Sequence, residues 1–135
     1  MEDDKSVGEA YTFAATAGNN HWRCPLVITW EDFAKVDIRA GQIVRAEQFP
    51  RAVKPSYKLW VDFGAEIGIK QSSAQLTECY RMEDLSGRQV LGVVNFAPRN
   101  VAGFLSEVLI LGLYSEQGVV LVAPERKVTN GDRLG

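Results

Sequence analysis

Residues 95–113 read NFAPRNVAGFLSEVLILGL, and they carry the most informative pattern in this 135-residue chain. They join the end of one apolar segment, residues 90–94, to the start of another, residues 108–111. The connection between the two segments, which we call the rim (residues 95–107), carries a cation, a hydroxyl and a carboxylate on Arg99, Ser106 and Glu107. Polar connections held by buried strands are frequent binding sites. The functional question is therefore what the rim holds.

The composition is that of one soluble globular domain, with 46% hydrophobic and 24% charged residues. No apolar run reaches the roughly 18 residues that a membrane span needs. The first residues are acidic and lack the pattern of a signal peptide. We therefore expect a cytoplasmic protein without membrane insertion.

The net charge of −2 argues against a protein that binds nucleic acid through its overall charge. The charge is uneven, however, because residues 35–58 hold six cations and only two anions. Such a segment forms either a basic patch or an ordinary solvated strand face. Charge alone favours the second interpretation.

The residue types that build metal and catalytic sites are scarce. Cys24 and Cys79 lie far apart in the sequence, and His21 is the only histidine. These spacings match no zinc motif, so we expect no metal, no cofactor and two reduced thiols. No glycine-rich phosphate loop and no nucleophile with its base can be identified, so we expect a protein that is not an enzyme.

The chain is expected to begin with a flexible extension, residues 1–28, followed by one domain, residues 29–135. At the start of that domain, Thr29-Trp30-Glu31-Asp32 resembles a capping box in which Asp32 replaces the usual glutamate. Phe33 then anchors a helix of one or two turns.

Alternating apolar residues predict two strands near the start of the domain. In residues 36–46, Val36, Ile38, Ala40, Val44 and Ala46 fall on even positions, and Gly41 allows a bend or bulge. In residues 57–63 the odd positions share a buried face: Tyr57, Leu59, Val61 and Phe63.

The later segments continue this β pattern. A weaker strand is predicted at 67–73, a short helix at 77–85 ending at Gly87, and apolar strands at 90–94 and 108–111. A hairpin turn at 116–118 leads into 119–123, and Asn130-Gly131 signals a last turn. Six strands with one helix predict an all-β protein, either a β-sandwich or a five-stranded OB barrel with additional terminal strands and a helix.

Residues 33–132 resemble the tRNA-binding-domain family. The resemblance is carried by VDIRAG (36–41), KPSYKL (54–59), QSSAQ (71–75), NF (95–96) and SEVL (106–109). It implies an OB barrel and a homodimer that pairs through segments at both ends of the domain, here residues 29–33 and 128–134. Within the family, the CsaA-like branch of chaperones is the most similar.

One position departs from the pattern of the family members that are appended to synthetases. Where those members carry Met-Arg-Gly, this chain has Val101-Ala102-Gly103. An arginine that other members aim at RNA is therefore absent, and Arg99 is the only cation left in this loop.

The predicted RNA-binding residues lie just before or within the second strand, in the third strand and in the rim. They are Lys54, Lys58, Ser72, Ser73, Asn95, Arg99, Gly103, Ser106 and Glu107. Cations and hydroxyls bind phosphate and sugar oxygens, and Asn95 and Glu107 could accept from bases or peptide groups. Each also has a structural interpretation: a solvated arginine, serines that begin a turn, or an asparagine that bonds to backbone.

Three apolar residues of the rim, Phe96, Phe104 and Leu105, are the predicted peptide-binding residues. They belong to the core, or they form an apolar groove for an extended polypeptide, or the aromatic rings stack on bases. In a homodimer, two such grooves could bind one chain by avidity.

The predicted function is that of a CsaA-like protein-secretion chaperone. It would bind unfolded or preprotein polypeptide and tRNA-like RNA without catalysis. The alternative is a dedicated structure-specific tRNA-binding protein that acts in trans with tRNA or with a synthetase.

Overall fold

A computed structural model describes residues 26–135, and the chain divides into two compact units between Val36 and Asp37. The described part of the first unit contains the helix α2 (Trp30–Ala34). Its capping box is confirmed, because Thr29 Oγ1 accepts from Asp32 N at 3.1 Å and Asp32 Oδ2 accepts from Thr29 N at 3.0 Å. The Phe33 ring packs against Trp30 with 5.6 Å between the centroids.

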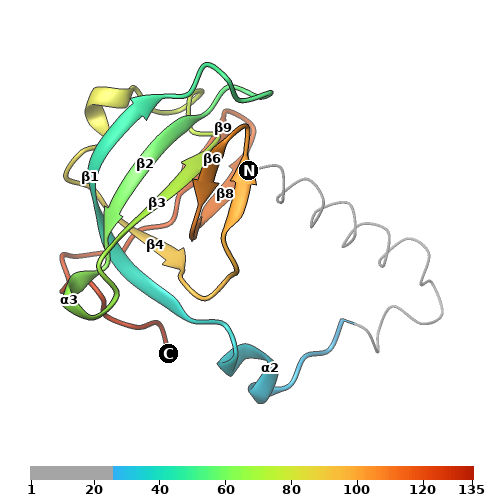
Figure 1. Ribbon diagram of the computed structural model, residues 1–135. Coiled ribbons are helices and arrows are strands. Elements are labelled where there is room, and N and C mark those ends of the chain that lie inside the picture. The colour runs from blue at the N-terminus through green and yellow to red at the C-terminus, as the bar shows by residue number, and fades with distance from the viewer. Residues whose placement is uncertain (1–25) are drawn as a thin grey trace. The chain divides into compact units, whose positions relative to one another are not determined.

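The second unit is built from short strands (Figure 1). Its strands are β1 (Ile38–Gln48), β2 (Tyr57–Asp62), β3 (Ile69–Ala74), β4 (Gln89–Val93), β5 (Arg99–Val101), β6 (Phe104–Ser106), β7 (Leu109–Ile110), β8 (Gly112–Ser115) and β9 (Gly118–Leu121). The helix α3 (Gly64–Ile67) and the 3₁₀ helix η1 (Met82–Asp84) are one turn each.

Five of these strands form a nearly closed antiparallel barrel, which confirms the predicted OB-type fold. Their order in the sheet is β3-β2-β1-β4-β7, and β1, β2 and β3 lie side by side in Figure 1. A backbone hydrogen bond from Glu107 N to Gln71 O, 2.8 Å long, joins β3 to the segment just before β7. Two hairpins, β5–β6 and β8–β9, are added to the barrel.

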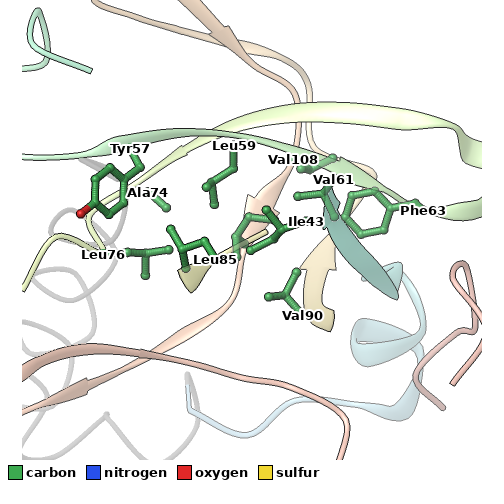
Figure 2. Packing of buried hydrophobic residues seen from close by; sticks show 11 residues of the cluster. Ile43, Tyr57, Leu59, Val61, Phe63, Ala74, Leu76, Leu85, Val90 and Val108 are labelled. Carbon is green, nitrogen blue, oxygen red and sulfur yellow. The ribbon is translucent and has the colours of Figure 1, made fainter. Parts of the chain in front are cut away.

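The core lies inside the barrel and follows the predicted pattern on β2. Tyr57, Leu59, Val61 and Phe63 are all buried, and they meet Leu85 and other apolar side chains from neighbouring segments (Figure 2). Each fully buried side chain of this size contributes about 1.5–3 kcal/mol relative to leaving it in water. Because the odd positions of β2 point inward, its even positions point outward.

The predicted alternation on β1 is only partly correct. Ala40 is buried as expected, but Val44 is 44% exposed and the buried residue is Ile43. A register shift against β2 between Ile43 and Arg45 explains the difference, because one extra residue reverses the phase of the side chains.

Gly41 has a different role from the predicted bend. A Cβ atom at this position would lie only 2.7 Å from side-chain atoms of Val61 and Phe63. The glycine therefore lets β1 pass close to the core, and the bulge lies further along the strand.

The helix predicted at 77–85 is wrong. Residues 77–79 form a turn, and only Met82–Asp84 is helical, as the 3₁₀ helix η1. Tyr80 lies between the turn and η1 and is held by tertiary hydrogen bonds. Its hydroxyl accepts from Leu121 N and its carbonyl accepts from the Tyr57 hydroxyl, each at 2.9 Å. Gly87 is left-handed, as predicted, with φ of +94°.

The C-terminal segment completes the pairing of β1. The first residues of β1, which precede its pairing with β2, are bonded to this segment. Gly131 N donates to Ala40 O at 2.7 Å, and Leu134 N donates to Ile38 O at 2.8 Å. The predicted Asn-Gly turn is confirmed by a φ of +100° at Gly131, whose carbonyl also accepts from Arg39. The Asp37 carboxylate raises the pKa of Arg39 by accepting its hydrogen bond, so this arginine stays charged.

Candidate nucleic-acid interface

The outward side of β2 presents Lys58 and Trp60. Both are half-buried, because the neighbouring hairpin β5–β6 supplies Phe104 against them. The Trp60 and Phe104 rings meet edge to face, with 5.8 Å between their centroids. This geometry is the preferred one for two aromatic rings.

Lys58 lies against two aromatic rings. Its Nζ is 5.1 Å from the centroid of Phe49 and 5.1 Å from that of Phe104, and these two rings are 5.5 Å apart. Cation–π contacts of this kind contribute about 0.5–1 kcal/mol at exposed sites. The rings therefore restrict where the ammonium group can lie.

Arg45 extends the same arrangement along β1. Its guanidinium carbon lies 4.7 Å from the Trp60 ring centroid, and its Nη2 donates to the carboxylate of Glu47. We call the resulting surface the aromatic–cation face. It consists of Arg45, Lys58, Trp60 and Phe104, together with the buried ring of Phe49 that packs against Lys58 and Phe104.

The tip of the β5–β6 hairpin reaches the loop between β1 and β2. Ala102 and Gly103 both have positive φ, +49° and +86°, as the tightest hairpin turns require. Asn100 Oδ1 accepts from Gly103 N at 2.8 Å and closes the turn. A Cβ on Gly103 would lie 3.8 Å from Arg51 Nη1, so that cation approaches the tip.

Several predicted RNA-binding residues lie at or beside the aromatic–cation face. Lys58 is part of it, Gly103 forms the hairpin tip, and Lys54 belongs to the same loop as Phe49 and Arg51. For Gly103, the left-handed backbone conformation is a sufficient reason for the glycine. Arg99 begins β5, directly opposite Ser106 of β6.

Ser72 and Ser73 occupy a different environment. They are only 1% and 2% exposed. The Ser72 hydroxyl donates to Val108 O at 2.8 Å and lies 3.3 Å from the Ser106 hydroxyl. These hydroxyls hold β3 to the segment that closes the barrel.

Glu107 also helps to join β3 to the segment that closes the barrel. Its carboxylate accepts from Gln71 N at 3.1 Å, while the Gln71 side chain donates to Leu105 O at 2.8 Å. We call this region the seam, and it consists of Gln71, Ser72, Ser106, Glu107 and Val108. A role of Ser72, Ser73, Ser106 and Glu107 in RNA binding stays a prediction.

Asn95 bonds to backbone where β4 ends. Its Oδ1 accepts from Asp37 N at 3.1 Å. This contact matches the structural interpretation of the residue, and any contact of Asn95 with a base stays a prediction.

The three predicted peptide-binding residues are not brought together. Phe104 packs into the aromatic–cation face, whereas Phe96 and Leu105 are 57% and 45% exposed. Leu105 is adjacent to Phe104 on β6, so the two side chains point to opposite sides of the hairpin.

Sequence reasoning missed three residues of the face: Arg45, Phe49 and Trp60. Trp60 could have been found, because the inward alternation of β2 already places Lys58 and Trp60 together outside. The positions of Phe49 and Arg45 beside Lys58 and Trp60 could not have been predicted, since they depend on the loop conformation and on the bulge in β1.

Neither a candidate metal site nor a membrane-spanning helix occurs in residues 26–135. Residues 26–135 contain no group of three or more His, Cys, Asp or Glu side chains that could hold a metal ion. Cys79 is a free thiol, and Cys24 and His21 lie outside the described residues. No helix within this range is long and apolar enough to cross a membrane.

Comparisons with known proteins agree with this architecture. The family model described as "Putative tRNA binding domain" matches residues 38–133. The methionine–tRNA ligase of Methanococcoides burtonii is 38% identical over 106 residues, which cover 78% of this chain but only 15% of the ligase. The chain thus spans a small part of that curated relative.

Two solved structures match over nearly their whole length. The CsaA chaperone of Picrophilus torridus has a TM-score of 0.78 and 44% identity, covering 81% of this chain and 100% of that one. The CsaA chaperone of Bacillus anthracis has a TM-score of 0.75 and 45% identity, covering 81% and 99%. The barrel, the family model and these likenesses together place the chain in the tRNA-binding-domain family.

Proposed function

We propose that this chain is a non-catalytic binding protein that holds tRNA-like RNA and unfolded polypeptide on the aromatic–cation face. In the cytoplasm it would act as a chaperone of the CsaA type for secreted proteins before their export. The observation that carries the proposal is the position of the Lys58 ammonium over the adjoining rings of Phe49 and Phe104, the second of which packs against Trp60.

RNA binding follows from the combination of rings and cations. Exposed ring surface stacks on bases at about 1–3 kcal/mol per base, and neighbouring cations neutralise phosphates. Lys58 and Arg45 lie directly on rings, and Arg51 and Lys54 come from the adjacent loop. The family model and the likeness to methionine–tRNA ligase support tRNA as the RNA.

Polypeptide binding uses the apolar part of the same surface. Unfolded segments expose aromatic and aliphatic side chains, which pack well against rings such as Trp60 and Phe104. Phe96 and Leu105 are also exposed, but Leu105 points to the other side of the hairpin, so its contact with a polypeptide would be separate from this surface. The likeness to CsaA chaperones supports this part of the proposal.

A homodimer would place two such faces in one assembly, so that one long RNA or polypeptide could bind both. Val27, Ile28 and Trp30 are largely exposed apolar residues near α2 and are candidates for pairing. The C-terminal segment is already bonded to β1 within the chain. Light scattering on a chain that begins at Lys35 tests this, since we expect a monomer, and a persistent dimer would contradict pairing through α2.

The test of the shared face is a competition experiment. Fluorescence anisotropy of labelled tRNA is measured across a salt series, and a chemically unfolded, soluble polypeptide is then added as competitor. We expect tRNA binding that weakens with salt and is displaced by the polypeptide. Trp60→Ala should weaken the binding of both tRNA and polypeptide.

Arg81→Gln is the matched control. Arg81 is an exposed cation paired with Asp84 at 3.2 Å, and it lies outside the aromatic–cation face. Absence of tRNA binding at low salt would refute the RNA part. Binding of both ligands without competition would refute the shared surface.

A further inference from the structure

A second cationic surface lies next to the aromatic–cation face. A cleft of about 430 Å³, within the range of ordinary ligand sites, is lined by Gln42, Tyr80, Leu121 and residues 87–89 and 123–127. Its charged side chains are Arg88, Arg126 and Lys127 against Glu125, so the cleft carries a net positive charge. None of its lining residues belongs to the aromatic–cation face.

Arg88 is held in place by its neighbours. Its Nε donates to Asp84 O at 2.9 Å, and its guanidinium carbon lies 5.2 Å from the Tyr80 ring centroid. Tyr80 is itself fixed, because its hydroxyl accepts from Leu121 N. These contacts use only one of the five N–H groups of the guanidinium, and the planar group is well suited to phosphate.

Arg126 is paired with a carboxylate of the same cleft. Its Nε and Nη2 lie 2.9 and 2.8 Å from Glu125 Oε1. Both side chains are about four-fifths exposed, so the pair is weak in water. A phosphate group in the cleft would compete with Glu125 for Arg126.

The cleft and the face are neighbours on β1. Gln42 lines the cleft and donates to Gly87 O at 3.2 Å. Arg45 of the aromatic–cation face follows three positions later, about 10 Å along a strand. One extended RNA strand can span this distance, since OB folds bind roughly 4–16 nucleotides.

We propose that RNA on the aromatic–cation face continues across β1 into this cleft, where Arg88, Arg126 and Lys127 bind its phosphates. The inference rests on the proposed RNA binding. It assigns the cleft to phosphate contacts without base recognition, because three of its four charged groups are cations and its Tyr80 ring is covered by Arg88.

The experiment compares oligouridylates of about four and about sixteen nucleotides, the two ends of the range for one OB fold. Anisotropy titrations at several salt concentrations use Arg88→Gln and the double variant Arg126→Gln/Lys127→Gln. Arg81→Gln is the matched control, because Arg81 and Arg88 both bond to Asp84 but only Arg88 lines the cleft.

We expect each cleft variant to weaken binding of the long RNA several-fold at low salt. The slope of log K against log salt should decrease by about 0.7 per lost phosphate contact. The short RNA and Arg81→Gln should be unaffected. Glu125→Gln should strengthen binding of the long RNA only, a gain that structural damage would not produce.

Three outcomes would overturn the inference. If Trp60→Ala weakens both RNAs while the cleft variants change neither, the cleft is not part of the path although RNA binds the face. If the cleft variants weaken short and long RNA equally, the cleft holds phosphate on its own rather than as a continuation. If Trp60→Ala changes neither RNA, the proposed RNA binding fails, and the inference fails with it.

Discussion

The aromatic–cation face and the seam lie next to each other in the barrel. Polar side chains extend toward the surface in the face, whereas in the seam they make hydrogen bonds within the protein. Lys58 on β2 and Ser73 on β3 are paired in register. The half-buried Lys58 extends its ammonium over the rings of Phe49 and Phe104, whereas Ser73 is buried and the adjacent Ser72 hydroxyl donates to Val108 O. Two residues predicted to bind the same ligand thus have very different access to it.

The difference comes from side-chain length and from hydrogen bonds already made. A short hydroxyl next to a strand junction is used to satisfy backbone groups, since leaving them buried without a partner is costly. A long cation can bury its stem and keep its charge in water. Polar residue type alone therefore does not identify a binding residue in this barrel.

Replacement of Trp60 should have the largest effect on binding. Trp60→Ala should lower RNA affinity by about 1–3 kcal/mol, the cost of one lost base stack. Anisotropy with labelled tRNA measures the change, and Tyr114→Ala, at an exposed aromatic residue of β8 outside the face, serves as the control. Unchanged RNA affinity in Trp60→Ala would contradict RNA binding on the aromatic–cation face.

Replacement of Ser72 should affect stability instead. Ser72→Ala removes the 2.8 Å hydrogen bond to the Val108 carbonyl and leaves it only the 3.4 Å contact from the Ser106 hydroxyl, so the free energy of unfolding should fall by about 0.5–1.5 kcal/mol. Urea denaturation measures this loss, and RNA affinity of the folded variant should stay the same. The reverse result, full stability with weakened RNA binding, would make the seam a binding site.

Neutralisation of Lys58 should change the salt dependence. Lys58→Gln removes one phosphate contact, so the slope of log K against log salt should decrease by about 0.7–0.9. Arg81→Gln removes an equal charge elsewhere and should leave the slope unchanged. Equal changes in both variants would indicate a general charge effect rather than a defined face.

The smallest expected effect is a gain at the hairpin tip. Ala102→Arg adds a cation beside Arg51, where the residue already adopts a positive φ, and should raise the slope by about one phosphate contact. Ala102→Gln is the uncharged control for length. If both variants bind RNA equally, the tip does not contact phosphate.

The fold could be predicted well because its signals are local. The alternation on β2, the capping box at Thr29 and the turn at Gly131 each depend on a few neighbouring residues. The failed predictions involve tertiary contacts: the bulge after Ile43, and the hydrogen bonds of Tyr80 that replace a helix.

The candidate site could be predicted only in part. Lys58 and Phe104 were named from the sequence and do meet, but Arg45, Phe49 and Trp60 were not. Their proximity arises when a loop, a bulged strand and a distant hairpin converge. The rim also contains a hairpin of its own, which a pattern of single residues did not indicate.

The most direct test of the contrast is nuclear magnetic resonance of the ¹⁵N-labelled protein during titration with a short unlabelled oligouridylate. The chain has three tryptophans, and Trp60→Phe assigns the indole N–H signal of Trp60. We expect that signal to shift on addition of RNA, while the amide signals of Ser72 and Glu107 stay in place. Shifts at Ser72 and Glu107 with an unmoved Trp60 indole would contradict the account and return the binding site to the seam.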